Sequence, residues 1–490
     1  MMISMSPAPS SHTASGSNGA SACEIDGSAR GPILLCFVTA AFWLIAGSLL
    51  ESVAAIKLVF PGFLDFAGML TYGRVHPVAL NFLVYGWASL AGIGIALWMM
   101  ARLCKTLLRW KALLICGIGL WNAALLVGGL AILGGAGSSI EWLEMPASIA
   151  GILFMAYAFI AVWVLVLFGA RSGGAGFVSQ WYLLAALLSF PWLYATANVL
   201  LRWNPIQGSA VPPIQGWYGT GLGVLWLAPM ALAAVYYFVA DAVKRPVFSE
   251  SLAAVGFWSL LVFGTWSGMR YLIGGPVPAW MMSASVAASV LLLVPMVAVW
   301  TNLAKTIGDD YPDIGHVDAV RFGVAGFVFY GVLTALNAAT SFPTTSSIFQ
   351  FTILSTGLTQ GLIYGFVSLV FFGAIYTIGP KLIGNGWEGA SRISLHFWLL
   401  VSGAGLVLLA AVLGGLVQGF ALADPAVSFM NTVQFATPFR AVIAVGELVI
   451  FAGNCIFGSI LVETLLREAL TVSPAVAAEE SLAATEEVSV

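Results

Sequence analysis

The chain has 490 residues, of which 60% are hydrophobic and only 8% are charged, and its formal net charge is −3. Soluble domains carry roughly 25% charged residues, so this composition excludes a water-soluble globular protein. Lys and Arg form no dense run, which excludes nucleic-acid binding, and the small net charge indicates no strongly charged partner.

The cysteines exclude two further classes of protein. The chain has five, Cys23, Cys36, Cys104, Cys116 and Cys455, and they show neither CxxC spacing nor a CxxCH motif. The sequence therefore predicts neither a disulfide framework nor a covalently attached haem.

Apolar stretches of about 20 residues recur along the chain, and each is long enough to cross a hydrocarbon layer of about 30 Å. They predict twelve transmembrane helices, near 32–56, 75–101, 111–134, 148–169, 181–201, 220–240, 252–273, 281–303, 320–341, 352–379, 395–420 and 438–465. Residues 1–31 are rich in Ser, Gly and Ala, and 467–490 are acidic, so both read as disordered cytoplasmic tails. The predicted fold is an all-α integral membrane domain over residues 32–466.

The basic residues orient the predicted helices. With both termini in the cytoplasm, thirteen of the 18 Lys and Arg residues fall on the inner side and five, Lys57, Arg74, Arg202, Arg270 and Arg440, on the outer side. This asymmetry obeys the positive-inside rule and supports both the count and the orientation.

Three segments carry a resemblance to a known family. They are Tyr72–Asn81, Trp217–Ser249 followed by Trp266–Gly268, and Phe351–Pro380. Together they resemble the large subunit of the haem-copper oxidases, most closely the cbb3-type cytochrome c oxidases and the related nitric oxide reductases. The resemblance implies a bacterial inner-membrane protein of aerobic electron transport, with lipid and a cytochrome c-type or other respiratory subunit as neighbours.

The same resemblance implies two haems and a copper ion held by six histidines. It places those ligands at six positions that hold other residues here: Ala79, Thr220, Arg270, Tyr271, Leu358 and Gln360. The family's redox-active tyrosine falls on Gly264. Leu358 and Gln360 stand two residues apart, so their side chains leave a helix about 200° apart, as in a helix that serves two haems. In the predicted topology all six positions lie in the outer part of the membrane.

A count of histidines reaches the same result without an alignment. The chain has four, His12, His76, His316 and His396, and six imidazoles cannot be built from them. Only His76 lies on the outer side of the predicted topology. It would serve as an interfacial anchor for its helix or, alternatively, as a haem ligand or a contact to a haem propionate. We therefore assign no catalytic, cofactor-binding or metal-ligating residue.

Five polar residues remain as candidates for a cavity or a proton route: Arg270, Tyr271, Gln360, Glu51 and Glu447. Arg270 would snorkel to the interface or pair with a partner carboxylate, or it would fill the vacated copper pocket and hydrogen-bond Gln360, Thr220 or Tyr271. The two glutamates would serve proton routes or, alternatively, hydrogen bonds between helices.

Three functions follow from these observations. The first is a non-catalytic relative that keeps the scaffold as a structural or regulatory membrane subunit. The second is a haem-binding oxidoreductase with unusual ligands such as His76 or Gln360. The third is a transporter that binds a small anion or another solute in the vacated cavity.

Overall fold

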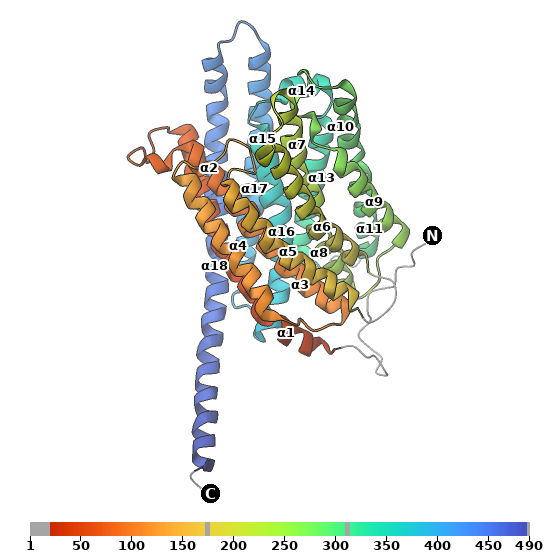
Figure 1. Cartoon of the computed structure of the whole chain (residues 1–490), viewed down its shortest axis with the longest axis vertical. Helices are drawn as coiled ribbons and strands as arrows, with labels where there is room; N and C mark the ends of the chain where they lie inside the picture. The colour runs from red at the N-terminus through yellow and green to blue at the C-terminus, as the bar shows by residue number, and fades with distance from the viewer. Residues whose placement is uncertain (1–19, 172–176, 309–313, 488–490) are drawn as a thin grey trace.

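The chain folds into a bundle of membrane-spanning helices (Figure 1). The structure is a computed structural model that describes residues 20–171, 177–308 and 314–487, with backbone alone from 471. These residues contain twelve helical segments long and apolar enough to cross a membrane, and they contain no strand. The predicted all-α fold and the predicted count of twelve spans are confirmed.

The first six spans follow the predicted order. They are α1 (Ala22–Val59), α2 (Tyr72–Asn81) with η2 (Phe82–Ala88) and α3 (Ser89–Cys104), α4 (Lys111–Leu133), α5 (Ala147–Gly169), α6 (Val178–Asn198) with η3 (Val199–Trp203), and α7 (Val211–Gly221) with η5 (Leu222–Leu227) and α8 (Ala228–Val243). Two short 3₁₀ turns, η1 (Gly68–Leu70) and η4 (Gly208–Ala210), lie in the connections.

The other six spans complete the bundle. They are α9 (Glu250–Trp266) with the 3₁₀ turn η6 (Met269–Leu272), α10 (Ala279–Leu291) with α11 (Leu293–Ile307), α13 (Asp318–Ala339), α15 (Leu354–Gln360) with η8 (Gly361–Ser368) and α16 (Leu369–Ile383), α17 (Ala390–Ala423), and α18 (Phe429–Glu487). The short helix α14 (Pro343–Phe349) connects α13 to α15.

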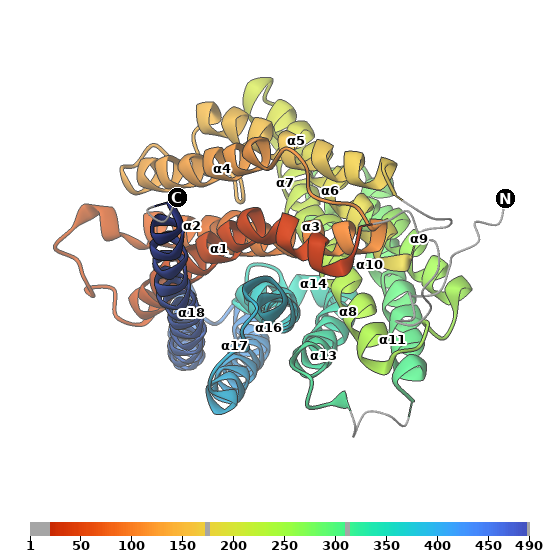
Figure 2. The same cartoon turned by 90° about the horizontal axis from the view of Figure 1, so that it is seen from below.

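Three of the spans form the centre of the bundle. In Tyr72–Cys104, Gly208–Val243 and Leu354–Ile383, 100%, 89% and 89% of the most apolar window is buried, against 39 to 50% in the other described spans. Figure 2 shows the peripheral helices α4 and α5, α9 and α11, and α17 and α18 arranged around them. The central spans also contain Ala79, Thr220, Leu358 and Gln360, four of the six positions given by the resemblance.

Each central span changes from α- to π-helical geometry near its middle. The π segments η2, η5 and η8 begin at Phe82, Leu222 and Gly361, within three residues of Ala79, Thr220 and Gln360. A fourth, η3, ends the span of α6. Such segments are rare and occur often at functional sites. Here they mark the level of the bundle at which the candidate positions lie.

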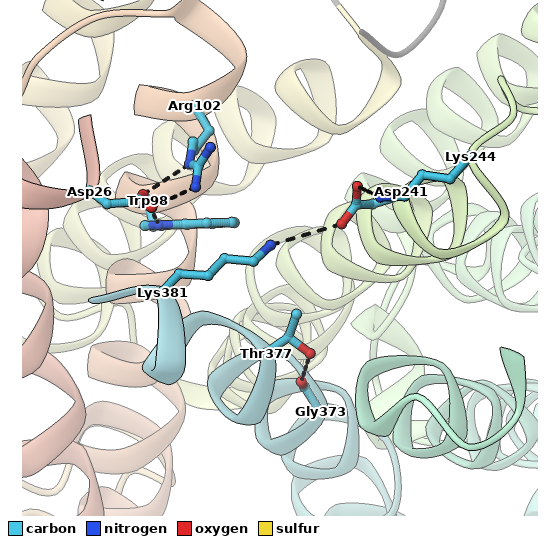
Figure 3. Close-up of polar contacts among 8 residues, drawn as sticks. All are labelled: Asp26, Trp98, Arg102, Asp241, Lys244, Gly373, Thr377 and Lys381. Carbon is cyan, nitrogen blue, oxygen red and sulfur yellow. Dashed lines mark hydrogen bonds and ion pairs between the residues drawn. The ribbon is translucent and has the colours of Figure 1, made fainter. Parts of the chain in front are cut away.

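The two ends of the bundle differ. We call the end that carries α14 the cavity end, and the end where α1 begins and α18 terminates the termini end (Figure 1). At the termini end Asp26 accepts hydrogen bonds from Trp98 and Arg102 of α3, and Lys381 of α16 lies 3.9 Å from Asp241 of α8 (Figure 3). These contacts join α1 to α3 and α16 to α8.

The described helices extend into both predicted tails. α1 begins at Ala22 rather than at 32, because Ser21 caps it in a capping box with Glu24 and because Asp26 is held by α3. α18 continues through the segment predicted as an acidic tail, as far as Glu487. That segment is rich in Ala and Glu, which favour helix.

Candidate functional site

A cavity of about 620 Å³ opens among the central spans at the cavity end. Its walls come from α7 and η5, η6, α13, α14, α15 with η8, and the loop that precedes α5. Its polar lining includes Thr220, Arg270, Tyr271, Asn337, Gln350 and Thr359. Its apolar lining includes Leu222, Leu333, Leu358, Leu362 and Ile363.

The cavity collects four of the six positions given by the resemblance. Thr220, Arg270, Tyr271 and Leu358 line it, whereas Ala79 and Gln360 are buried outside its wall. The prediction that Leu358 and Gln360 face different sides agrees with this placement. None of the four lining side chains supplies a nitrogen that could bind copper or haem iron: Leu358 has no donor atom and Arg270 carries a positive charge.

Arg270 enters the cavity from a turn and not from a helix. The helix α9 ends at Trp266, and Gly268 then adopts φ +90°, a conformation that favours glycine. A Cβ atom at Gly268 would also lie 2.5 Å from the carbonyl oxygen of Gly216. The following turn η6 points Arg270 toward α13.

The partners of Arg270 correct one sequence-based prediction. Its Nη2 donates to Asn337 Oδ1 at 2.7 Å and its Nη1 to the carbonyl oxygen of Thr340 at 3.4 Å. It does not hydrogen-bond Gln360, Thr220 or Tyr271 in the described structure. The predicted partners were wrong, although Arg270 does line the cavity. The prediction placed Arg270 in the last turn of a helix, whereas the chain has already left that helix at Gly268.

Tyr271 closes the cavity toward its loop wall. Its hydroxyl donates to Glu141 Oε2 at 3.2 Å, and its carbonyl oxygen accepts from Gln350 Nε2 at 2.8 Å. The loop, α14 and η6 are therefore tied together around the mouth of the cavity.

A packed polar cluster occupies the other side of α15. Gln360 Nε2 donates to Glu51 Oε1 at 2.8 Å, and Glu51 Oε2 lies 2.9 Å from Nδ1 of His76. His76 also stacks on Tyr72, with ring centroids 5.2 Å apart. Glu51 thus joins α1 to α2 and α15, as expected of a hydrogen bond between helices, and both His76 Nδ1 and Gln360 Nε2 are engaged by it.

Glu447 lies close to this cluster but has a different environment. It is fully buried on α18, and neither of its carboxylate oxygens has a hydrogen-bond partner among the described residues. Glu51 is near enough to act on it electrostatically, as both glutamates act on Tyr364. A carboxyl group in this setting is uncharged unless a cation or a proton donor reaches it.

The loop between α4 and α5 contacts the central spans through Glu144 and Trp142. Glu144 accepts hydrogen bonds from Asn81 Nδ2 at 2.8 Å and from the Trp142 backbone N–H at 3.0 Å. Tyr85 of η2 donates to the carbonyl oxygen of Trp142 and contacts the Tyr218 hydroxyl at 2.8 Å. Burial raises the pKa of Glu144 to about 7, although the donors oppose that change.

Two haems and a copper ion held by six histidines would require several imidazole groups close together. Among the residues that the structure describes, no group of three or more His, Cys, Asp or Glu side chains could hold a metal ion. The three described histidines lie on different elements. His76 lies within α2, His316 lies in the loop before α13, and His396 is buried on α17 with Nδ1 3.0 Å from the Tyr376 hydroxyl. His12 lies outside the described residues.

The match to a family model decides the relationship. The model described as "Cytochrome C and Quinol oxidase polypeptide I" matches residues 32–449. This chain belongs to that family. The predicted membership of the haem-copper oxidase superfamily is thereby confirmed, and the apolar spans make the chain an integral membrane protein.

Relatives in this oxidase family cover most of the chain. A "Cbb3-type cytochrome c oxidase subunit CcoN1" of Stutzerimonas stutzeri is 27% identical over 431 residues, which cover 84% of this chain and 90% of the relative. A "Cytochrome c oxidase subunit 1 homolog" of Azorhizobium caulinodans is 25% identical over 480 residues, covering 91% and 84%. A cryo-EM structure of a heme-copper terminal oxidase dimer has the same fold, with a TM-score of 0.69, 13% identity and coverage of 89% and 84%.

Several residues of the site were missed from the sequence. Asn337, Glu141 and Glu144 were not singled out, although an amide within an apolar span and carboxylates beside one are unusual enough to be noticed. Asn337 lies in the predicted span 320–341, and its position near the outer end could have suggested a partner for Arg270.

Proposed function

We propose that this chain is a non-catalytic member of its family, which serves as a structural or regulatory subunit in a bacterial inner membrane. One observation carries the proposal: the cavity is lined by Thr220, Arg270, Tyr271 and Leu358 at the positions that the resemblance gives to metal ligands. A cation repels copper and a leucine cannot ligate iron.

The second side of α15 bears on the alternative, a haem-binding oxidoreductase with unusual ligands such as Gln360 or His76. Glu51 engages His76 through Nδ1 and Gln360 through Nε2, so His76 Nε2 and Gln360 Oε1 lie outside this network. A histidine that ligates a metal commonly donates its other ring N–H to a carboxylate. Haem analysis of the purified chain therefore decides between the two functions.

The proposal places both termini in the cytoplasm and a cytochrome c-type or other respiratory subunit beside the chain. Arg102, Lys244 and Lys381 gather at the termini end, in agreement with the positive-inside rule (Figure 3). The cryo-EM relative is a dimer, which supports an assembly without naming a partner.

The test is to purify the full chain from its native membrane and to measure haem by pyridine haemochrome, copper by mass spectrometry and oxygen consumption with reduced cytochrome c. We expect less than about 0.1 non-covalently bound haem and 0.1 copper per chain, and no oxygen consumption above a protein-free control. Stoichiometric haem and copper with turnover would overturn the proposal. Haem staining of subunits that co-purify with the chain would test the partner separately.

A further inference from the structure

The cavity contains a guanidinium group that lacks a counter-charge. Arg270 contacts an amide oxygen and a backbone carbonyl oxygen, and no described carboxylate lies within ion-pair distance of it. A guanidinium has five N–H donors, and its side chain uses two of them here. The remaining donors are available to a ligand in the cavity that Arg270 lines.

Arg270 is partly buried, and a partly buried positive charge is stabilised by an accompanying anion. Arg also prefers planar anions that accept two parallel hydrogen bonds, as a carboxylate does. The electrostatics of the cavity therefore favour a ligand that carries a negative charge at the Arg270 wall.

The rest of the cavity restricts the ligand further. Leu333, Leu358, Leu362 and Ile363 belong to its lining, and an apolar body would be buried against them. Glu141 also lines the cavity, so a second negative charge on the ligand would be repelled. A volume of about 620 Å³ lies within the usual range for small-molecule sites, roughly 300 to 1,000 Å³.

We infer that the cavity binds an organic monocarboxylate with an apolar body, its carboxylate on Arg270 and its body against the leucines. The inference rests on the proposed function, since a cavity that held haem or copper would not be free for this ligand. It goes beyond that function by giving the site a ligand class.

Isothermal titration of the full chain in lipid nanodiscs tests the inference, with 3-phenylpropionate as the probe and its neutral amide as the matched compound. Octanoate and acetate complete the series. We expect saturable binding of one 3-phenylpropionate per chain with Kd below about 1 mM, binding of the amide at least tenfold weaker, and acetate weaker than octanoate because it lacks an apolar body.

Three variants locate the site. Arg270→Gln and Leu358→Trp should each weaken binding at least tenfold, the first by removing the charge and the second by filling the cavity. Arg74→Gln is the control, because Arg74 donates to the carbonyl oxygen of Leu133 and does not line the cavity. If Arg270→Gln fails to fold, the outcome with Leu358→Trp and the comparison of acid with amide decide.

The inference is overturned if no carboxylate of the series binds saturably below about 10 mM, if the amide binds as well as the acid, or if Leu358→Trp leaves binding unchanged. Haem analysis of the same preparation separates the two proposals. Stoichiometric haem refutes the proposed function together with the inference, whereas haem-free protein that binds no carboxylate refutes the inference alone.

Discussion

The two sides of α15 differ in structure, although Leu358 on one side and Gln360 on the other are only two residues apart in the sequence. Leu358 borders an open cavity that contains the Arg270 guanidinium, which has no carboxylate partner among the described residues. Gln360 is 1% exposed and lies in a network with Glu51 and His76. A cavity remains on the Leu358 side of α15, whereas polar side chains pack the Gln360 side.

The difference teaches that loss of a cofactor's ligands need not have one structural outcome. The buried polar network of Glu51 stabilises a packed helix contact through the hydrogen bonds it forms, although Gln360 Oε1 has no partner among the described residues. A cavity lined by a charged group retains a cost that only water or a ligand can remove. The open side is therefore where a function beyond scaffolding should be sought, and the following predictions test the contrast.

The largest effect is expected where α15 is fixed against α17. A Cβ atom at Gly357 would lie 2.3 Å from the Cβ of Ala411, so Gly357→Leu should push the two helices apart and turn both Leu358 and Gln360. We expect a loss of about 3 kcal/mol or more in the free energy of unfolding, measured by SDS titration. Gly405→Leu is the matched control, since nothing lies within 4 Å of that position. Equal stability of the two variants would contradict the close packing.

The free energy of unfolding should depend on pH by roughly 2 to 3 kcal/mol because of Glu144, which accepts a hydrogen bond from Asn81 of α2. Its pKa is raised from 4.5 to about 7 by burial, so the folded chain holds the proton more tightly than the unfolded chain. The stabilisation is complete below about pH 4.5 and is lost as the pH rises through 7. When the pH is raised from 5 to 7.5, the SDS midpoint of unfolding should decrease more for the wild type than for Glu144→Gln. Parallel profiles would remove Glu144 as the cause.

The smallest effects compare the two faces of α15 directly. Gln360→Leu leaves Glu51 Oε1 without its donor and should cost about 1 to 2 kcal/mol, whereas Leu358→Phe extends into open space and should cost less than about 0.5 kcal/mol. SDS titration of both variants measures the contrast. If Leu358→Phe is the more harmful substitution, the cavity is not open as described.

Hydropathy predicted much of the fold, because every span must be apolar over about 20 residues whatever it packs against. The opposite directions of Leu358 and Gln360 were also predictable, because helical geometry alone separates positions two residues apart. The partners of Arg270 were not, because the turn at Gly268 redirects the chain and its φ of +90° is visible only in the structure. The fold of the loop around Glu144 likewise depends on contacts with Asn81 and Tyr85 from another span.

The π segments η2, η5 and η8 divide each central span into two helical halves. A π turn takes up one residue more than an α turn, so the half that follows it is rotated by about 100° relative to an uninterrupted helix. Deletion of a single residue within η8 would therefore rotate α15 against α16, so that Leu358 would turn away from the cavity while α16 kept its own contacts. A substitution in α15 leaves this rotation unchanged, because it does not alter the number of residues between the two halves.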